Sequence, residues 1–348
     1  MILRIAMIGF GNVGQEFASM LLARREWLLK DRGLDAEVLA IYTKSRGALL
    51  SKRALDLGKC LELVRGGRNL SEYGPESTSL SPVELISKCN ADVLIELSPL
   101  NIESGQPAID HIVAGIENGM DVVTANKGPV AFAYKRLRNL ARSKGIHFRF
   151  EGTVMDGTPI FNLVEKTLQG CEVLGLEGIL NSTSNYVLTE MTSGKTVEQA
   201  VRAAQKGGFA EADPSLDLEG WDAAAKITAL ANVLMDADTT PKSVDRQGIG
   251  GIEAKDIERA SSLNKKYKLI ARAEAAGEGI RLSVRPEMIG PDSTFWSVDG
   301  TSSALTIRTD LMGDLTILET NPRVTQTAYA VFSDILSVLE SIRAGTAH

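Results

Sequence analysis

Apolar and polar positions alternate with two different periods over the first 150 residues. Short apolar runs predict buried strands at 2–9, 37–42, 92–97, 121–124 and 147–150. Between them, apolar residues recur at helical spacing over 12–29, 109–118 and 134–145. Strands that alternate with helices are typical of a parallel sheet covered on both faces. We therefore expect an α/β fold whose residues 1–150 form a dinucleotide-binding, doubly wound Rossmann domain.

The pattern changes after residue 150. It predicts helices over 159–168 and 220–235, and strands over 174–180, 281–285, 295–298 and 304–307. This mixture indicates a second, α+β domain over residues 151–318. An apolar stripe at helical spacing over 325–342 predicts a C-terminal helix that packs on another element. Residues 319–348 are therefore expected to return to the nucleotide-binding domain.

Composition and charge exclude several classes of protein. The 348 residues are 44% hydrophobic and carry a net charge of -6, so disorder and nucleic-acid binding are not expected. The longest stretch without a charged residue, 178–189, is shorter than the roughly 18 to 20 residues of a membrane-spanning helix. The first apolar run leads directly into a glycine turn, which leaves no room for a signal peptide. We expect a cytoplasmic protein.

Cysteine and histidine are too scarce to carry the chemistry. The three cysteines are widely spaced, and their number is odd, so they predict neither a disulfide framework nor a zinc site. With three histidines, one of them the last residue, a Ser/His/Asp triad or a zinc-binding pair is not favoured. We therefore expect carboxylates, lysines and backbone groups to carry out catalysis and binding.

A glycine-rich turn follows the first predicted strand. Gly9-Phe-Gly11-Asn12-Val13-Gly14 matches the dinucleotide fingerprint and opens a predicted helix. The first glycine makes the turn, the second lets a pyrophosphate approach the backbone, and the third allows close packing of helix on strand. A purely structural glycine turn is the alternative interpretation. The position between a strand and a helix N-terminus, which can hold an anion, favours cofactor binding.

The end of the second predicted strand bears on the choice of cofactor. NAD-preferring sites usually place a carboxylate there, whereas here Tyr42 is followed by Thr-Lys44-Ser45-Arg46. The two cations and the hydroxyl are suited to a 2′-phosphate, so we predict NADP, with NAD as the alternative. The competing interpretation of Lys44 and Arg46 is a pair of solvated loop cations.

A dense acidic loop leads into the predicted helix at 220–235. It contains Glu211, Asp213 and Asp217, and the helix places Asp222 four residues before Lys226, so that these two side chains share one face. A surface ion pair is the structural alternative. The residues around the lysine are apolar, which indicates that Lys226 emerges from a covered surface. We therefore interpret the cluster as a functional site.

A second lysine, Lys127, follows a predicted strand at the edge where α/β sheets bind ligands. A solvated loop lysine is the alternative. Reduction of a carbonyl needs positive charge or a proton donor at the oxygen, and a substrate ammonium needs carboxylates. The chain offers both kinds of group.

These motifs resemble the homoserine dehydrogenase family over nearly the whole chain. Besides the fingerprint, the resemblance depends on five segments: Val122-Val-Thr-Ala-Asn-Lys-Gly128, Glu151-Gly-Thr-Val-Met-Asp-Gly-Thr-Pro159, Asn181-Ser-Thr-Ser-Asn-Tyr-Val-Leu188, Gly208-Phe-Ala-Glu-Ala-Asp-Pro214 and Gly220-Trp-Asp-Ala-Ala-Ala-Lys226. The resemblance implies reduction of L-aspartate 4-semialdehyde to L-homoserine with NAD(P)H, in the biosynthesis of threonine, methionine and isoleucine. It also implies a homodimer or a larger homo-oligomer, with residues 151–318 as the substrate-binding and dimerisation domain.

The resemblance assigns roles to individual residues. Lys226 would donate the proton, with Asp222 beside it, and Lys127 would assist near the nicotinamide and the substrate oxygen. The residues that would hold the amino acid are Glu211, Asp217, Asp222 and Thr183. Ser98 falls where the family contacts the nicotinamide side of the cofactor. The family often binds sodium through main-chain oxygens, here those of Glu151, Val154, Asp156 and Thr158, and a tight loop without an ion is the alternative.

Two departures from the family pattern concern the substrate pocket and the cofactor. Ser182 replaces a glycine in the Asn-Gly-Thr motif, which predicts a narrower pocket. Residues 319–323 replace a glycine-rich loop with stiffer and more polar residues. No regulatory domain or fused kinase is expected.

Our leading hypothesis is NADPH-dependent reduction of aspartate semialdehyde in a cleft between the two domains, with Lys226 as proton donor. One alternative is a dehydrogenase of the same fold for another small hydroxy or amino acid. Another is a non-catalytic NADP-binding protein.

Overall fold

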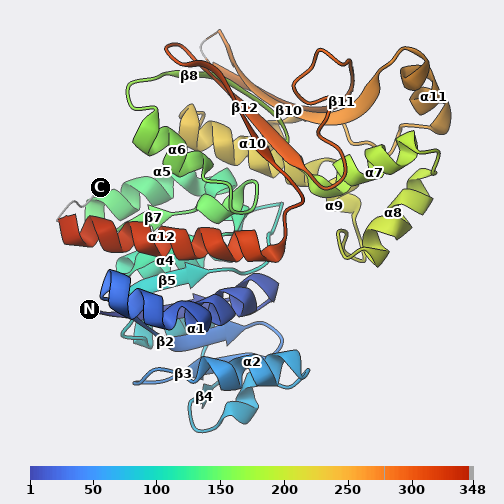
Figure 1. The fold of residues 1–348 in the computed structure, drawn as a ribbon. Helices are drawn as coiled ribbons and strands as arrows, with labels where there is room; N and C mark the ends of the chain where they lie inside the picture. Colours follow the sequence, from blue (N-terminus) through green and yellow to red (C-terminus); the bar gives the residue numbers. More distant parts are fainter. Residues whose placement is uncertain (278, 345–348) are drawn as a thin grey trace. The chain divides into compact units, whose positions relative to one another are not determined.

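A computed structural model describes residues 1–277 and 279–344 (Figure 1). The chain divides into two compact units. One contains Met1–Pro159 together with the segment that starts at Arg323, and the other is Ile160–Pro322. The domain boundaries predicted from the sequence, at residues 150 and 319, stay predictions, because a division into compact units does not test them.

The first unit contains a seven-stranded sheet with the order β4-β3-β2-β1-β5-β6-β7. Its parallel strands are β1 (Ile2–Ile8), β2 (Asp35–Thr43), β5 (Val93–Glu96), β6 (Asp121–Thr124) and β7 (Phe148–Arg149). Two short strands, β3 (Gly47–Leu50) and β4 (Ser77–Thr78), add an antiparallel edge that the sequence pattern did not reveal. The expected α/β fold with a Rossmann-like sheet is confirmed.

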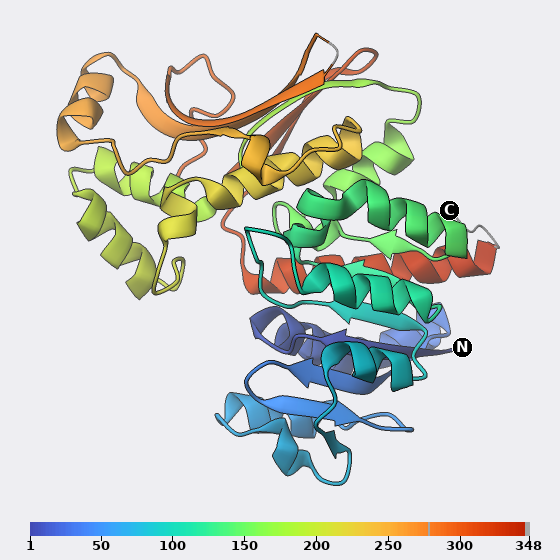
Figure 2. The same ribbon diagram turned by 180° about the vertical axis from the view of Figure 1, so that it is seen from behind.

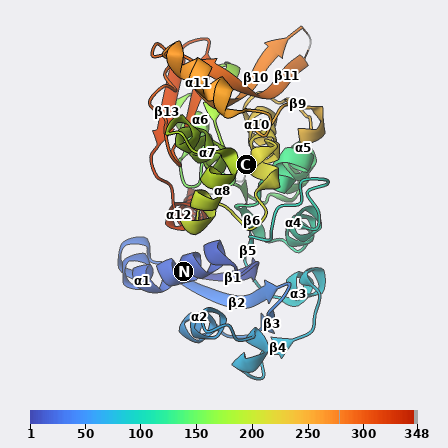
Figure 3. The same ribbon diagram turned by 90° about the vertical axis from the view of Figure 1, so that its right-hand side faces the viewer.

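Helices cover both faces of this sheet. One core cluster joins β1 and β2 to α1 (Asn12–Arg32), α2 (Leu57–Arg65) and α12 (Val324–Ala344). A second cluster joins the other face to α3 (Pro82–Lys88), α4 (Ala108–Glu117) and α5 (Lys127–Lys144). Figure 3 shows α1 and α2 on one side of the sheet and α3 and α4 on the other, and Figure 2 shows the unit from behind. Two 3-10 turns, Leu70–Tyr73 and Glu151–Thr153, complete the unit.

The C-terminal helix α12 packs on the first unit. Val331, Phe332 and Ile335 are buried in the cluster that contains α1. The backbone N–H of Glu151 donates to Asp334 Oδ2 at 2.9 Å. The predicted return of the C-terminal segment is therefore observed, and its apolar stripe is the cause.

The second unit contains a six-stranded sheet with the order β13-β12-β8-β10-β11-β9. The strands are β8 (Val173–Ile179), β9 (Asp245–Arg246), β10 (Lys266–Ala276), β11 (Gly279–Ile289), β12 (Ser303–Thr309) and β13 (Gly313–Glu319). All pairs are antiparallel except β9 with β11. The helices are α6 (Ile160–Thr167), α7 (Ser182–Thr192), α8 (Val197–Lys206), α9 (Ser215–Leu218), α10 (Trp221–Leu234) and α11 (Ala254–Ser262), with a 3-10 turn at Pro241–Ser243.

One predicted strand is wrong. Residues 295–298 form turns, and Phe295 and Val298 are buried because they pack against Ile179, Ile270 and Ala304. Their apolar spacing reflects a loop that covers the sheet rather than a strand within it. No helix among the described residues is long and apolar enough to cross a bilayer.

Candidate active site

The turn between β1 and α1 is built for close approach of a ligand to the backbone. Gly9 has φ 109°, and a Cβ there would lie 2.5 Å from the carbonyl oxygen of Leu97. A Cβ on Gly14 would lie 2.8 Å from the carbonyl oxygen of Gly9, whereas a Cβ on Gly11 meets no heavy atom of the described chain within 4 Å. The packing of the turn thus requires Gly9 and Gly14, and Gly11 leaves its side open for a ligand.

Helix α1 presents its N-terminus at the same turn. Its first residues, Asn12, Val13, Gly14 and Gln15, carry no carboxylate, so their N–H groups and the helix dipole favour an anion. β1 pairs in parallel with β2 on one side and β5 on the other. Dinucleotides bind at this reversal of strand order. The fingerprint residues therefore lie together and fit the pyrophosphate of a nicotinamide dinucleotide.

The predicted 2′-phosphate residues occupy the turn between β2 and β3. Lys44 and Ser45 are exposed. Arg46 is half-buried, and its Nη1 donates to the carbonyl oxygens of Val64 (2.8 Å) and Arg68 (3.4 Å). Arg46 therefore helps to hold α2 and the turn that follows it, a structural role that the sequence pattern did not indicate.

Ser98 and Lys127 lie after neighbouring parallel strands, β5 and β6. Asn126 caps α5 by accepting from the N–H of Gly128 at 3.0 Å, and its Nδ2 donates to the carbonyl oxygen of Ser98 at 2.8 Å. Lys127 is the first residue of α5 and is partly exposed. One asparagine thus links the two segments that carry Ser98 and Lys127.

In the second unit, Lys226 lies on α10 among buried apolar residues. Its Nζ is 3.1 Å from Asp222 Oδ2 and donates to the carbonyl oxygen of Leu180 at 2.8 Å. The side chains of Lys226 and Asp222 are 15% and 14% exposed. The contact expected from their four-residue spacing is therefore present, and it is not a solvated surface pair.

Asn181 connects two acidic residues, a role that sequence reasoning missed. Its Nδ2 donates to Asp217 Oδ1 at 2.7 Å and to Asp222 Oδ2 at 2.9 Å. Its Oδ1 caps α7 by accepting from the N–H of Ser184 at 2.7 Å. An asparagine directly before Ser-Thr-Ser is an N-cap signal that could have identified it. We call Asn181, Thr183, Asp217, Asp222 and Lys226 the Asn181 cluster.

Electrostatics within the Asn181 cluster disfavour the ionised form of Asp217. Burial and then the neighbouring charge of Asp222 raise the pKa of Asp217 above its usual value. Hydrogen bonds from Asn181 and Thr183, and the charge of Lys226, partly offset that rise. Two close carboxylates that gain from additional positive charge are suited to an ammonium ligand.

Glu211 lies apart from these contacts. It is exposed on the loop between α8 and α9, where its carbonyl oxygen accepts from Gln205 Nε2 at 3.2 Å. Thr183 Oγ1 donates to the carbonyl oxygen of Phe209 in the same loop at 3.1 Å. Within the described chain, no hydrogen bond joins the Glu211 carboxylate to the Asn181 cluster.

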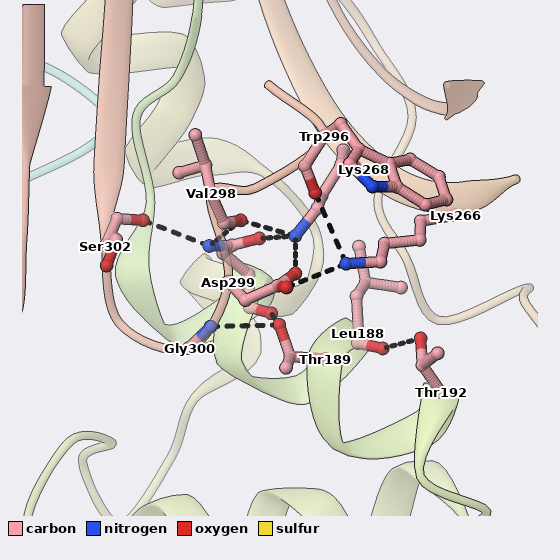
Figure 4. Close-up of polar contacts among 11 residues, drawn as sticks. Leu188, Thr189, Thr192, Lys266, Lys268, Trp296, Val298, Asp299, Gly300 and Ser302 are labelled. Atoms are coloured by element: carbon pink, nitrogen blue, oxygen red, sulfur yellow. Dashed lines mark hydrogen bonds and ion pairs between the residues drawn. The ribbon is translucent and has the colours of Figure 1, made fainter. Parts of the chain in front are cut away.

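A buried lysine anchors helix α7, which begins at the Asn181 cluster. Lys268 Nζ donates to Asn185 Oδ1 (2.9 Å), to Asp299 Oδ1 (2.8 Å) and to the carbonyl oxygen of Val298. Figure 4 shows Lys268 and Lys266 converging on Asp299. Burial lowers the pKa of Lys268, against the opposing effect of Asp299. Because Asn185 is one turn after Asn181, this network holds the helix that carries the cap.

The segment predicted to bind sodium forms a tight loop in the first unit. Met155 and Asp156 have φ of 49° and 51°, and the N–H of Thr158 donates to the carbonyl oxygen of Met155 at 2.9 Å. Asp156 Oδ1 accepts from Thr327 Oγ1 at 2.9 Å, while Glu151 and Val154 are buried. The Asp156 side chain therefore serves the contact with α12.

The two departures from the family pattern have clear local structures. Ser182 is the first residue of α7 and is partly exposed. Asn321 has φ 49°, a left-handed conformation that asparagine tolerates better than most residues. The loop thus keeps a glycine-like backbone turn without a glycine.

Two family models match adjacent parts of the chain. The model described as "Homoserine dehydrogenase, NAD binding domain" matches residues 9–151, and the model described as "Homoserine dehydrogenase" matches residues 159–336. Among relatives, a homoserine dehydrogenase of Methanocaldococcus jannaschii is 36% identical over 97% of this chain and 99% of its own length. An NAD(+)-dependent homoserine dehydrogenase of Pseudomonas canavaninivorans is 33% identical over 97% of this chain and 96% of its own.

Solved structures agree with these matches. A putative homoserine dehydrogenase of Archaeoglobus fulgidus has a TM-score of 0.84 at 29% identity, covering 97% of this chain and 99% of its own. A homoserine dehydrogenase of Thermoplasma acidophilum has a TM-score of 0.82 at 26% identity, covering 98% and 100%. The chain belongs to the homoserine dehydrogenase family, the NAD(P)-dependent oxidoreductases that interconvert L-aspartate 4-semialdehyde and L-homoserine.

Proposed function

We propose that this chain reduces L-aspartate 4-semialdehyde to L-homoserine with Lys226 as the proton donor. The observation that carries the proposal is the position of the Lys226 ammonium. It contacts Asp222 and the carbonyl oxygen of Leu180, and Asn181 links Asp222 to a second carboxylate, that of Asp217. A reduced nicotinamide supplies the hydride when it is bound. As charge develops on the aldehyde oxygen, Lys226 stabilises it and transfers a proton to it.

The carboxylates of the Asn181 cluster would hold the amino group of the substrate. Asp217 and Asp222 both accept from the amide nitrogen of Asn181, and burial and then the charge of Asp222 raise the pKa of Asp217. A substrate ammonium between them would favour the ionised form of Asp217. Thr183 lies in the first turn of α7, the helix that Asn181 caps. Glu211 is an exposed carboxylate on the loop between α8 and α9. We assign both to substrate binding on the family resemblance.

Lys127 is proposed to act from the nucleotide-binding unit. It begins α5 at the carboxyl end of β6, beside the segment that carries Ser98. A cation there would favour negative charge on the substrate oxygen. Its role and that of Ser98 depend on the family resemblance.

For the cofactor, we propose a preference for NADP over NAD. Support comes from Lys44 and Ser45, which are exposed directly after β2, where a carboxylate for the ribose is absent from the sequence. Two observations favour NAD. Arg46 Nη1 already donates to the carbonyl oxygens of Val64 and Arg68 instead of being free for a 2′-phosphate, and one relative is NAD(+)-dependent. Comparing kcat/KM for the two cofactors decides between them. A higher kcat/KM with NAD would reject the NADP preference.

We further propose that a sodium ion binds main-chain oxygens of residues 151–158. The left-handed backbone at Met155 and Asp156 supports this, because it turns successive carbonyl groups in a short loop. The test is a thermal melt in sodium and in potassium chloride at equal ionic strength. An equal Tm in the two salts would contradict the proposal.

We also propose a homodimer or a larger homo-oligomer. The edge strand β13 and the turn before it expose Leu311, Met312 and Leu318, by 74%, 59% and 53%. An edge strand with exposed apolar side chains is typical of a surface that pairs with another chain. Light scattering coupled to size-exclusion chromatography tests this, and a monomeric mass at micromolar concentration would reject it.

The activity itself is tested by following nicotinamide absorbance when the purified protein meets L-homoserine and NADP, and then NAD. Rapid reduction of the cofactor is expected. A protein that binds NADPH but does not oxidise homoserine would have a different substrate or no activity. A panel of small hydroxy and amino acids then separates these two cases, and Ser182 is the first residue to examine.

A further inference from the structure

A fully buried carboxylate at the carboxyl end of β5 has no part in the chemistry described so far. Glu96 is 0% exposed, and its Oε1 accepts from the N–H of Ser98 (3.1 Å) and from the Ser98 hydroxyl. His111 Nδ1, on α4, is 3.3 Å from the same oxygen, and Thr124 Oγ1 is 3.4 Å from Oε2. Burying a carboxylate in an apolar strand is costly unless hydrogen bonds compensate it, and the contacts with Ser98, His111 and Thr124 supply them.

The position of this cluster points to the cofactor. β5 is the strand beside β1 at which the strand order reverses, so its carboxyl end borders the dinucleotide crevice. A Cβ on Gly9 would lie 3.0 Å from the backbone nitrogen of Ser98, which places Ser98 directly beside the phosphate-binding turn. Ser98 is partly exposed, whereas Glu96 and His111 behind it are buried.

The hydrogen bonds fix the polarity of the Ser98 hydroxyl. Its single proton is directed at Glu96, so a ligand meets only oxygen lone pairs. The N–H of Ser98 is also directed at Glu96, and its carbonyl oxygen accepts from Asn126 Nδ2 at 2.8 Å. The tautomer of His111 that carries its proton on Nδ1 would donate to this carboxylate. Ser98 is thus held as an acceptor for an N–H or O–H donor, and the carboxamide NH2 is the N–H donor at the nicotinamide end of the cofactor.

We propose that Glu96, supported by His111, is a positioning residue that fixes Ser98 as the acceptor for the carboxamide NH2 of the nicotinamide ring. The inference rests on the proposed function in that the chain binds a nicotinamide dinucleotide with its nicotinamide end at Ser98. It gives the site a specificity for the amide over groups of similar shape that lack an N–H. An amide held in one orientation also holds the ring to which it is attached.

The test compares NADP with its 3-acetylpyridine analogue, in which a methyl group replaces the NH2. Dissociation constants are measured by titration calorimetry, so no turnover is needed. The wild-type chain is expected to bind NADP about tenfold more tightly than the analogue, since one hydrogen bond of roughly 1.4 kcal/mol is at stake. Ser98→Ala should reduce that ratio to near one, mainly by weakening NADP binding.

Glu96→Gln separates positioning from a merely structural role through a double-mutant cycle. Alone, it should reduce the preference for NADP, whereas in the Ser98→Ala background it should not change the preference further. Asp121→Asn is the matched control, because Asp121 accepts from a second buried histidine, His147 (2.9 Å), at the opposite end of β6. It should lower Tm and leave the preference unchanged.

Four outcomes would overturn the proposal: a preference that Ser98→Ala leaves intact, a preference that Glu96→Gln alone leaves intact, an effect of Glu96→Gln that persists in the double variant, or no binding of either NADP or NAD. If the chain binds only NAD, the comparison is made between NAD and its 3-acetylpyridine analogue. A chain that shows the expected preferences but does not oxidise homoserine would reject the proposed reaction and leave this inference standing.

Discussion

Asn181 holds two acidic side chains of the second unit in fixed positions with a single amide. Its Nδ2 donates to Asp217 and Asp222, and Asp222 in turn pairs with Lys226. Burial, and then the charge of Asp222, raise the pKa of Asp217, so the ionised form of Asp217 is disfavoured beside Asp222. A positive charge beside Asp217 and Asp222 would favour the ionised form of Asp217, as the charge of Lys226 already does.

Asp217→Asn should separate binding from stability. The raised pKa of Asp217 stabilises the fold below pH 3.8, and this contribution is lost as the pH rises through the raised pKa. The variant keeps a neutral side chain, so its Tm at neutral pH should equal or exceed that of the wild type. Its KM for homoserine should rise at least about tenfold, because a charge-assisted hydrogen bond is lost.

Asp213→Asn is the matched control for this experiment, because Asp213 lies on the same loop but is exposed and bonds Ser215. It should change KM little. A Tm for Asp217→Asn several degrees below that of the wild type would contradict the disfavoured ionisation of Asp217, and an unchanged KM would contradict the binding role.

At the scale of elements, the β1–α1 turn and helix α7 carry the site. The turn was predictable because its glycines follow an apolar strand and open a helix, a local pattern. The anchoring of α7 was not predictable, because its partners are distant in sequence. Lys268 is 83 residues after Asn185, and Asp299 is 114 residues after it. Only the folded chain brings them together, and Figure 4 shows Lys268 beside Asp299.

Gly11→Ala should impair cofactor binding without harming the fold. A Cβ at this position meets no heavy atom of the described chain within 4 Å and φ is -77°, so Tm should stay within a few degrees of the wild type. The methyl group would occupy the approach of the pyrophosphate, and we expect the Kd for NADPH to rise at least about tenfold. Gly250→Ala, which is equally open but lies in the second unit, is the control. Equal Kd values for the two variants would contradict the assignment.

Lys268→Met should destabilise the chain strongly. It removes the donor from three acceptors and leaves Asp299 with one lysine, so the free energy of unfolding should fall by about 3–5 kcal/mol. Lys266→Met is the matched control, because Lys266 binds the same aspartate but is 22% exposed, and it should cost about 1 kcal/mol or less. Urea unfolding measures both. Equal losses would show that Lys268 is not a special anchor.

At the scale of the whole molecule, the chain builds its first unit from two separate segments, residues 1–159 and the segment from Arg323 onward. The alternation of strands and helices predicted the parallel sheet, and the apolar stripe of α12 predicted that helix. The short strands β3 and β4 escaped prediction because two to four residues carry too little periodicity. The turns at 295–298 were mistaken for a strand because buried loop residues can mimic its alternation.

The candidate site was predictable to a similar degree. Asp222 and Lys226 are neighbours on one helix, so spacing sufficed for their contact. The double hydrogen bond of Asn181 and the burial of Glu96 depend on residues distant in sequence, which spacing does not reveal.

The most direct test of the proposed chemistry is the turnover of Lys226→Ala, measured with homoserine and the preferred cofactor, alongside its Kd for NADPH. If Lys226 transfers the proton, kcat should fall by about 10²- to 10⁴-fold while the Kd stays within about twofold of the wild-type value. Near-normal kcat in a variant that binds NADPH normally would contradict the role of Lys226.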